Sequence, residues 1–202
     1  MEKHAVVIGA SAVGSIAAKE LAKRGIEVDL LEEDSKVGKF GKCGGIFSKH
    51  GMDYTGVNYR DLVLNEIHGA RIIAGNEELK VRRPEVQAVV LSRQAFDERA
   101  ADEAVSEGVN LHLNSRVADF QTDGKMIAVT SDNHSYSAPV LFGCDGNSSV
   151  TARKLKFPPI KLSDCVISYQ AEFIKANVPD KELVDLILDN RHYRNFFLWT
   201  IP

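Results

Sequence analysis

The stretch "HAVVIGASAVGSIAAKELAKRGIEVDLLEE", residues 4–33, decides the fold class. It opens with a short apolar run rich in β-branched residues, which is typical of a buried parallel strand. Apolar residues then recur at helical spacing from Ala12 to Arg24, and Gly25 provides a stop signal. A second apolar run, residues 26–33, ends in acidic residues. The stretch therefore predicts a β-α-β unit.

The turn between the first strand and the helix carries the pattern G-x-S-x-x-G at Gly9, Ser11 and Gly14. In dinucleotide folds the first glycine makes the tight turn, the middle one lets the backbone approach a pyrophosphate, and the third lets helix pack on strand. The pyrophosphate then sits at the helix N-terminus, beside Ala12 and Val13, where N–H groups and the dipole favour an anion. Ser11 departs from the pattern, because its hydroxyl either crowds the phosphate or donates a hydrogen bond to it.

An acid at the end of the second strand strengthens this interpretation. Glu32 stands where a carboxylate accepts hydrogen bonds from both ribose hydroxyls of an adenosine. The alternative is an ordinary β-α-β unit whose glycines serve only the turn.

The rest of the chain reads as a mixture of strands and helices after a long irregular segment, residues 34–59. The "TDGK" turn, residues 122–125, predicts a hairpin. The three strands expected directly after the irregular segment, over residues 70–75, 79–83 and 88–93, are spaced like an antiparallel meander. Strands are expected over residues 70–75, 79–83, 88–93, 109–114, 116–123, 125–132, 136–146, 165–174 and 195–202, and helices over residues 94–108, 148–155 and 180–190.

Composition excludes several function classes. The net charge of −3 offers no basic stripe for nucleic acid. Cys43, Cys144 and Cys165 are far apart and form no C-x-x-C pair, so neither a disulfide framework nor a zinc site is expected. The histidines show no metal spacing either. We therefore expect no metal site, and we expect the protein to be located in a reducing cytoplasm.

The N-terminus imitates a signal peptide, since Lys3 precedes an apolar run. Gly9, Ser11 and Gly14 break that run at turn-like spacing, which favours the β-α-β interpretation. No stretch reaches the roughly 18 continuous apolar residues of a membrane-spanning helix. A cytoplasmic location is expected, with peripheral contact with a membrane left open.

Two later segments, "LSRQAFDERA" and "LFGCDGNSSV", resemble signatures of the flavoprotein family that includes p-hydroxybenzoate hydroxylase and the geranylgeranyl reductases. The resemblance implies FAD as cofactor, with Arg93 near its phosphates and the backbone of Val117 against adenine. Arg93 has an alternative role in a salt bridge with Asp97. Asp145 either accepts a hydrogen bond from the cofactor or caps the helix that follows it.

Two further segments resemble the geranylgeranyl reductases in particular. The element "KCGGI" follows the ribose acid, and the resemblance implies that Cys43, Gly44 and Ile46 lie at the flavin ring, with Cys43 as a small contact or a modest proton donor. A purely structural thiol is the alternative. The segment "FLWTIP" is similar to the family's Y-x-W-x-F-P motif, which implies an isoprenoid pocket. Its lining residues would be Phe197, Trp199 and Ile201, although the same residues also suit a buried strand.

Together these features predict an α/β fold in which an FAD-binding dinucleotide fold with a parallel sheet is interleaved with a mostly antiparallel substrate domain. We assign residues 1–60 and 94–156 to FAD binding, and residues 61–93 and 157–202 to part of the substrate domain. Because the family continues past the tryptophan motif, the chain is expected to be truncated. By itself it is expected to bind FAD weakly or not at all, and to be inactive.

The resemblance implies an FAD-dependent oxidoreductase that reduces isoprenoid C=C bonds. Its substrate would be an isoprenoid lipid, and its electrons would come from a ferredoxin-like protein or NADPH. One alternative is an aromatic hydroxylase or halogenase on the same fold. Another is a non-catalytic flavin-domain half or partner subunit.

Overall fold

The computed structural model describes residues 3–39, 43–132, 134–192 and 196–202. They form two compact units, each assembled from separate stretches of chain. These units are defined by contacts between residues and not by function. The assignment of residues to FAD binding or to the substrate domain therefore stays a prediction. The first unit comprises residues 1–41, 56–58 and 94–159, and the second comprises residues 42–55, 59–93 and 160–202.

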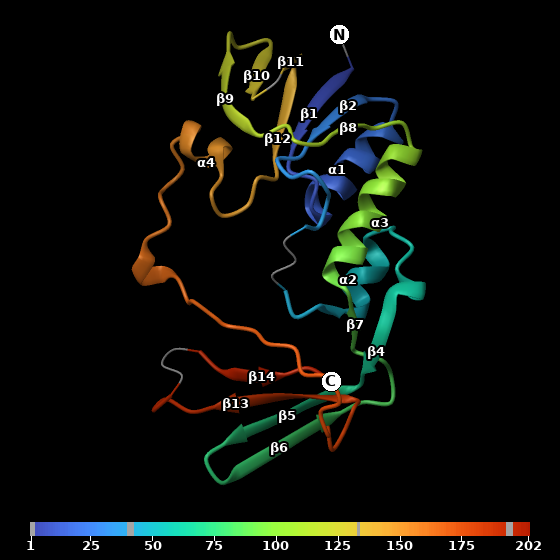
Figure 1. Cartoon of the computed structure of the whole chain (residues 1–202), viewed down its shortest axis with the longest axis vertical. Helices are drawn as coiled ribbons and strands as arrows, with labels where there is room; N and C mark the ends of the chain where they lie inside the picture. The colour runs from blue at the N-terminus through green and yellow to red at the C-terminus, as the bar shows by residue number, and fades with distance from the viewer. Residues whose placement is uncertain (1–2, 40–42, 133, 193–195) are drawn as a thin grey trace. The chain divides into compact units, whose positions relative to one another are not determined.

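A four-stranded parallel sheet forms the centre of the first unit (Figure 1). The strand order is β12 (Val140–Gly143), β1 (His4–Ile8), β2 (Glu27–Leu31) and β8 (Asn110–His112). The helices that accompany it are α1 (Ala12–Ala22), α3 (Arg93–Ser106) and α4 (Val150–Lys154). The predicted β-α-β unit and its parallel sheet are therefore confirmed.

Alternating side chains on the parallel strands explain the packing of this unit, since neighbours along a strand face opposite sides of the sheet. Val7 and Leu30 belong to a buried cluster that also contains Ala18 of α1 and Ala104 of α3. Their neighbours along the strands, among them Ile8, face a second cluster. Helices thus cover one face of the sheet and strands cover the other.

The covering strands form an antiparallel sheet of β9 (Val117–Thr122), β10 (Ile127–Ser131) and β11 (Ser135–Ala138). The predicted hairpin joins β9 to β10. Its turn contains Gly124 at a positive φ of 89°, and the Asp123 carboxylate accepts hydrogen bonds from the N–H groups of Lys125 and Met126. Pro139, which has no N–H, separates β11 from β12, so the single predicted strand over 136–146 is two strands.

The second unit contains two more sheets. One has the order β3 (Ile46–Ser48), β7 (Ala88–Leu91) and β4 (Val63–Ile67), all antiparallel. The other has the order β14 (Leu198–Thr200), β13 (Leu183–Leu188), β5 (Gly69–Ala74) and β6 (Glu77–Arg82). Short helices complete it: α2 (Lys49–Tyr54), η1 (Arg60–Leu62) and η2 (Leu162–Asp164).

Several predictions for this unit were wrong. The helix predicted over residues 180–190 is absent, and Leu183–Leu188 within it form β13, because parallel pairing with β5 and antiparallel pairing with β14 outweigh a weak helical preference. The predicted meander is confirmed for its first two strands, since β5 and β6 pair antiparallel, but its third strand is wrong, because β7 pairs with β3 and β4 and not with β6. Residues 165–174 form no strand within the described chain.

The irregular segment over 34–59 contains β3 and α2, and its residues 40–42 lie outside the described residues. The last predicted strand is observed as β14, although its first residue, Asn195, is not among the described residues. Within the described ranges, no helix is long and apolar enough to cross a bilayer.

Candidate functional site

The predicted cofactor turn follows β1 at the carboxyl ends of the parallel strands. Gly9 has a φ of +93°, and a Cβ on it would lie 2.5 Å from the carbonyl oxygen of Cys144. A Cβ on Gly14 would lie 1.8 Å from the carbonyl oxygen of Gly9. Both positions therefore require glycine, the first for the turn and the second for close packing of α1, as the motif predicts.

The N-terminus of α1 is held by a carboxylate from α3. The Oδ1 atom of Asp97 accepts a hydrogen bond from the N–H of Ala12 at 2.9 Å, and its Oδ2 atom accepts one from the Ser11 hydroxyl at 3.1 Å. Asp97 is 4% exposed, whereas Ser11 and Ala12 are half-buried, so these bonds are partly shielded from solvent. Val13, in the next position of the helix, is 70% exposed.

Glu32 lies directly beyond β2 and bonds to the same turn. Its Oε2 atom accepts a hydrogen bond from the N–H of Ala10, and its Oε1 atom accepts one from the N–H of Asp34, both at 2.9 Å. The structure therefore brings the predicted ribose acid to the glycine turn. Its contact with ribose stays a prediction.

Arg93 and Val117, the other residues that the resemblance assigns to FAD, occupy the first positions of α3 and β9. Val117 is buried in the cluster between the two sheets of the first unit, so only its backbone is available to a ligand. The carboxylate of Asp97, the alternative partner proposed for Arg93, bonds to Ser11 and Ala12. The contacts of Arg93 and Val117 with FAD stay predictions.

Asp145 caps α4. Its carboxylate accepts hydrogen bonds from the Ser149 hydroxyl at 2.6 Å and from the N–H of Thr151 at 3.0 Å. Burial alone raises the pKa of Asp145, but these hydrogen bonds outweigh it and hold the pKa below its ordinary value. The capping alternative is thus observed, while a bond to the cofactor stays a prediction. Burial, helped by Asp145, raises the pKa of the neighbouring Cys144 thiol, so this cysteine is a poor nucleophile.

In the second unit, the cysteine-glycine element lies against the tryptophan motif. A Cβ on Gly44 would lie 2.8 Å from Cδ1 of Ile201 and 3.8 Å from Nε1 of Trp199. Gly45 has a φ of +70°, and a Cβ on it would lie 2.2 Å from the carbonyl oxygen of Leu91. Segments separated by more than 150 positions in the sequence thus lie close together. Gly44 leaves room for the side chain of Ile201, and Gly45 leaves room for the backbone of Leu91.

The aromatic residues of the motif form a cluster around β14. Phe196 and Phe197 stack with ring centroids 4.5 Å apart, and Trp199 meets both rings edge-on at 5.9 Å and 6.1 Å. Phe197, Trp199 and Ile201 are all half-buried, so they are neither solvated nor closed in a core. Cys43 is a half-buried free thiol, and Ile46 begins β3.

Two residues near these clusters were missed from the sequence. Asp97 was considered only as a salt-bridge partner of Arg93, and no local pattern in the sequence pointed to its bond with the glycine turn. Gln170 had no signal: its amide donates a hydrogen bond of 3.4 Å to the carbonyl oxygen of Cys43. Its place beside the cysteine-glycine element depends entirely on the fold.

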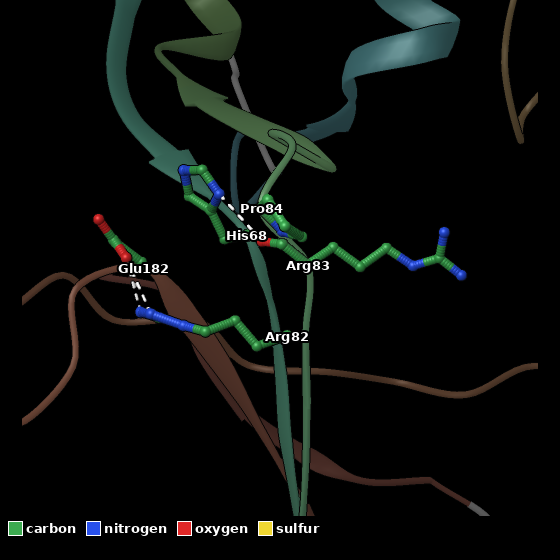
Figure 2. Close-up of a pocket in the computed structure, with 5 residues that line it drawn as sticks. All are labelled: His68, Arg82, Arg83, Pro84 and Glu182. Carbon is green, nitrogen blue, oxygen red and sulfur yellow. Dashed lines mark hydrogen bonds and ion pairs between the residues drawn. The ribbon is translucent and has the colours of Figure 1, made fainter.

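A hollow of about 440 Å³ lies elsewhere in the second unit and contains no predicted site residue (Figure 2). Arg82 pairs with Glu182 at 2.6 Å, which neutralises its charge, and Figure 2 shows the Arg83 side chain extending away from that pair. The residues that line this hollow therefore offer no arrangement of side chains that suggests catalysis. Its lining residues are His68, Arg82, Arg83, Pro84 and Glu182.

Comparison with known proteins identifies relatives of this chain. An uncharacterized protein of Methanocaldococcus jannaschii is 28% identical over 199 residues, which are 98% of this chain and 50% of the relative. The digeranylgeranylglycerophospholipid reductase 2 of Methanopyrus kandleri is 26% identical, over 100% of this chain and 52% of the relative. The chain thus spans about half the length of these curated relatives.

A solved structure has the same fold. It is a geranylgeranyl bacteriochlorophyll reductase-like protein from Thermoplasma acidophilum, with a TM-score of 0.80 and 21% identity over 98% of this chain and 53% of that chain. The family model described as FAD binding domain matches residues 2–196. The chain therefore belongs to the FAD binding domain family, which confirms the predicted α/β fold and the FAD cofactor, and its similarity to the named reductases agrees with the resemblance to the geranylgeranyl reductases.

Proposed function

We propose that this chain forms the flavin- and substrate-binding part of an FAD-dependent reductase that saturates C=C bonds of isoprenoid lipids. The observation that carries the proposal is the proximity of Gly44 to Ile201 and Trp199, both of which lie within 3.8 Å of the position that a Cβ on Gly44 would take. This proximity brings together the two motifs that resemble the geranylgeranyl reductases. The name of the Methanopyrus kandleri relative supports the same class of substrate.

The residues of the glycine turn fit the adenosine diphosphate part of FAD. Gly9 and Gly14 keep the turn tight, and the N–H groups of Val13 and Gly14 stand at the start of a helix of 11 residues. Glu32 supplies a carboxylate beside the same turn for the ribose. We assign Ser11, Ala12, Arg93, Val117 and Asp145 to the same cofactor.

In the second unit we assign Cys43, Gly44 and Ile46 to the flavin ring, and Phe197, Trp199 and Ile201 to the isoprenoid chain. When FAD is bound and reduced, its flavin would supply hydride to one carbon of the alkene. The aromatic cluster offers an apolar surface that orients the alkene and excludes water. The Cys43 thiol holds a proton for the second carbon.

The test supplies the complete gene product with FAD, dithionite and a digeranylgeranyl glycerophospholipid. The expected product gains one H₂ for each reduced bond, as seen by mass spectrometry. Lipid that stays unsaturated while the protein holds FAD would contradict the proposal. Consumption of oxygen with hydroxylated product would instead indicate a monooxygenase.

Cys43→Ser tests the proton donor, with Cys165→Ser as its control because Cys165 is an exposed free thiol. Cys43→Ser should keep the affinity for FAD and lose turnover by roughly tenfold or more, since a hydroxyl is a much weaker acid than a thiol. Unchanged turnover would leave the thiol with a structural role only.

The electron donor and the location of the protein are also proposals. A ferredoxin-like protein or NADPH would reduce the flavin, and replacing dithionite by each in turn distinguishes the two. A lipid substrate favours a cytoplasmic protein that contacts a membrane peripherally. Co-sedimentation with vesicles that contain the substrate lipid, compared with vesicles that lack it, tests this contact.

A further inference from the structure

The strand β6 (Glu77–Arg82) forms an open edge of the sheet β14-β13-β5-β6 in the second unit. Figure 1 shows it as the outermost strand of this sheet, beyond β5. All six of its residues are exposed, and among the described residues no strand lies on the far side of β6. An edge strand of this kind presents a row of unpaired N–H and C=O groups, which is a template for pairing with another chain.

The backbone groups on the open side of β6 belong to Glu78, Lys80 and Arg82. The N–H of Arg83 donates a hydrogen bond of 2.9 Å to the carbonyl oxygen of His68, in continuation of the pairing of β6 with β5. The carbonyl of Arg82 lies in the same peptide unit as this N–H and therefore points away from β5. Because the direction alternates along a strand, the groups of Lys80 and Glu78 point away as well. No hydrogen bond within the described chain uses these outward groups.

Most of the features that protect an edge strand are absent from β6. It contains neither Pro nor Gly, and its pairing with β5 has no bulge. It does carry charges, but their sign changes along the strand: Glu77 and Glu78 come first, and Lys80 and Arg82 follow. When such a strand pairs antiparallel with a copy of itself, acid stands opposite base, which stabilises the pair.

One register of this self-pairing suits both the backbone and the charges. If Leu79 stands opposite Leu79 of a second copy, Glu78 stands opposite Lys80 on both sides of it, and these are positions whose backbone groups point outward. A register shifted by two residues would place Lys80 opposite Lys80. It would also place Glu78 opposite Arg82, whose guanidinium already donates a hydrogen bond of 2.6 Å to Glu182. The register centred on Leu79 is therefore favoured.

The same register extends an apolar row across the sheet. Trp199, Leu186, Ile72 and Leu79 are successive cross-strand neighbours from β14 to β6. The row ends at Leu79, which is 59% exposed. In an antiparallel pair, opposite residues that exchange no hydrogen bonds are the closest, with about 4.5 Å between their Cα atoms. Leu79 of each copy would therefore cover Leu79 of the other.

We propose that two copies of this chain pair antiparallel through β6, centred on Leu79, and that their sheets become one continuous sheet. The second copy is the occupant that the charges favour, because the order of charges along β6 is complementary to itself. A strand of another protein would need the same order of charges to fit equally well. The strand has six residues, so the interface is small, and the dimer is reversible and depends on concentration.

The first test uses the complete gene product and exchanges the charges of β6. Glu78→Lys puts like charges opposite each other on both sides of Leu79, and so does Lys80→Glu. Each variant should weaken the dimer by roughly tenfold or more in sedimentation velocity. An equimolar mixture of the two variants should recover the dimer, because acid again stands opposite base. The double variant Glu78→Lys, Lys80→Glu should dimerise for the same reason.

Matched controls change a charge elsewhere in the second unit. Glu66→Lys and Lys181→Glu alter exposed residues outside β6 and should leave the dissociation constant of the dimer unchanged. The side chains of Glu78 and Lys80 are 43% and 60% exposed, so the melting temperature of every variant should stay close to that of the unchanged protein. This measurement separates a loss of the dimer from a loss of the fold.

A disulfide tests the register. Leu79→Cys should join two copies in the presence of oxidised glutathione, because the Cα atoms of such a pair lie within the distance that a disulfide bridges. Val81→Cys is the control, since Val81 would stand opposite Glu77 and not opposite itself. Both variants also carry Cys165→Ser, which removes an exposed thiol. Equal crosslinking by the two variants would exclude the register centred on Leu79.

Three further results would overturn the proposal. A gene product that stays monomeric at high concentration would show that a second copy does not bind this edge. A dimer that neither single charge variant weakens would have its contact elsewhere. A mixture of the two variants that associates no better than either variant alone would show that β6 of one copy does not face β6 of the other.

Discussion

The hydroxyl of Ser11 donates a hydrogen bond to the buried carboxylate of Asp97, 86 positions away in the chain. Ser11 does not cap α1 with its own side chain; Asp97 takes that role from α3 by accepting the N–H of Ala12. While the bond to Asp97 is made, the Ser11 proton is not available to a phosphate. The serine that interrupts the glycine motif therefore ties the cofactor turn to α3.

Replacing Asp97 tests whether this tie positions the turn. Asp97→Ala leaves two donors without an acceptor, so the free energy of unfolding should fall by roughly 1–3 kcal/mol. Affinity for FAD should fall as well, because the turn is no longer fixed. Asp97→Asn should restore most of both quantities, since its carbonyl oxygen still accepts the N–H of Ala12.

Urea unfolding and a fluorescence titration with FAD measure the two quantities. Asp102→Ala is the matched control, because Asp102 lies on the same helix with an exposed side chain. If Asp97→Ala lost stability but kept its full affinity for FAD, Asp97 would be a helix cap without influence on the cofactor.

The two glycines after Cys43 should respond differently to alanine. Gly45→Ala requires a left-handed backbone and brings Cβ to 2.2 Å from the carbonyl oxygen of Leu91, so a loss of roughly 2–4 kcal/mol is expected. The one close approach of a Cβ at Gly44→Ala is to Cδ1 of Ile201, the tip of a side chain that can rotate, so this variant should cost less than about 1 kcal/mol.

A double-mutant cycle between Gly44→Ala and Ile201→Ala measures this contact by thermal unfolding. The small loss in Gly44→Ala should disappear when Ile201 is shortened. Equal losses in Gly44→Ala and Gly45→Ala, or no coupling with Ile201, would contradict the proposed proximity of the two motifs.

A buried ion pair anchors residues 56–58 to the helices of the first unit. Lys19 of α1 is 2% exposed, and its Nζ atom lies 2.9 Å from Oε2 of Glu103 and 2.8 Å from the carbonyl oxygen of Gly56. Glu103→Gln leaves a buried ammonium without a counter-charge and should cost roughly 3–5 kcal/mol.

Lys19→Met should cost less, because the side chain of Glu103 is 25% exposed and keeps the N–H of Asn58 as a donor. Urea unfolding of both variants and of the double variant measures the asymmetry. The exposed pair of Lys23 and Glu20 is the control, where removal of either partner should cost less than about 1 kcal/mol. Equal losses in Lys19→Met and Glu103→Gln would contradict this account.

Asp185 should make the stability of the second unit sensitive to acid. Its carboxylate receives two hydrogen bonds from Arg71, at 2.8 Å and 2.7 Å, and one from Thr200 at 2.9 Å. The bonds from Arg71 hold the pKa of Asp185 below its ordinary value of 3.8, although burial opposes them. The ion pair therefore stabilises the fold above that value, and its contribution is lost as pH falls through the lower folded-state pKa.

Asp185→Asn should lower the free energy of unfolding by roughly 1–2 kcal/mol at neutral pH. The difference from the native sequence should shrink in strong acid, where the native carboxyl is itself protonated. Urea unfolding at both pH values is the measurement. The control is Asp180→Asn, because Asp180 is in an exposed ion pair with Arg82. A difference that persists unchanged in strong acid would mean that the loss is steric.

Local patterns in the sequence predicted the parts of the fold whose interactions are themselves local. The glycine spacing, the helix stop at Gly25 and the "TDGK" turn all correspond to features of the structure. Residues 180–190 were predicted wrongly because their strand conformation depends on β5, which lies more than 100 residues earlier. Gln170 had no local signal, since its partner Cys43 is 127 positions away.

The sequence by itself determined the dinucleotide turn, the acid that follows the second strand, and a family resemblance that implies FAD. These depend on backbone conformation and spacing, which short stretches of residues specify directly. Only the tertiary structure decided that Asp97 binds the turn, that Gly44 lies beside Ile201, and that Gln170 bonds to Cys43. Such contacts depend on how distant segments pack, because burial and strand pairing are set by neighbours in space rather than neighbours in sequence.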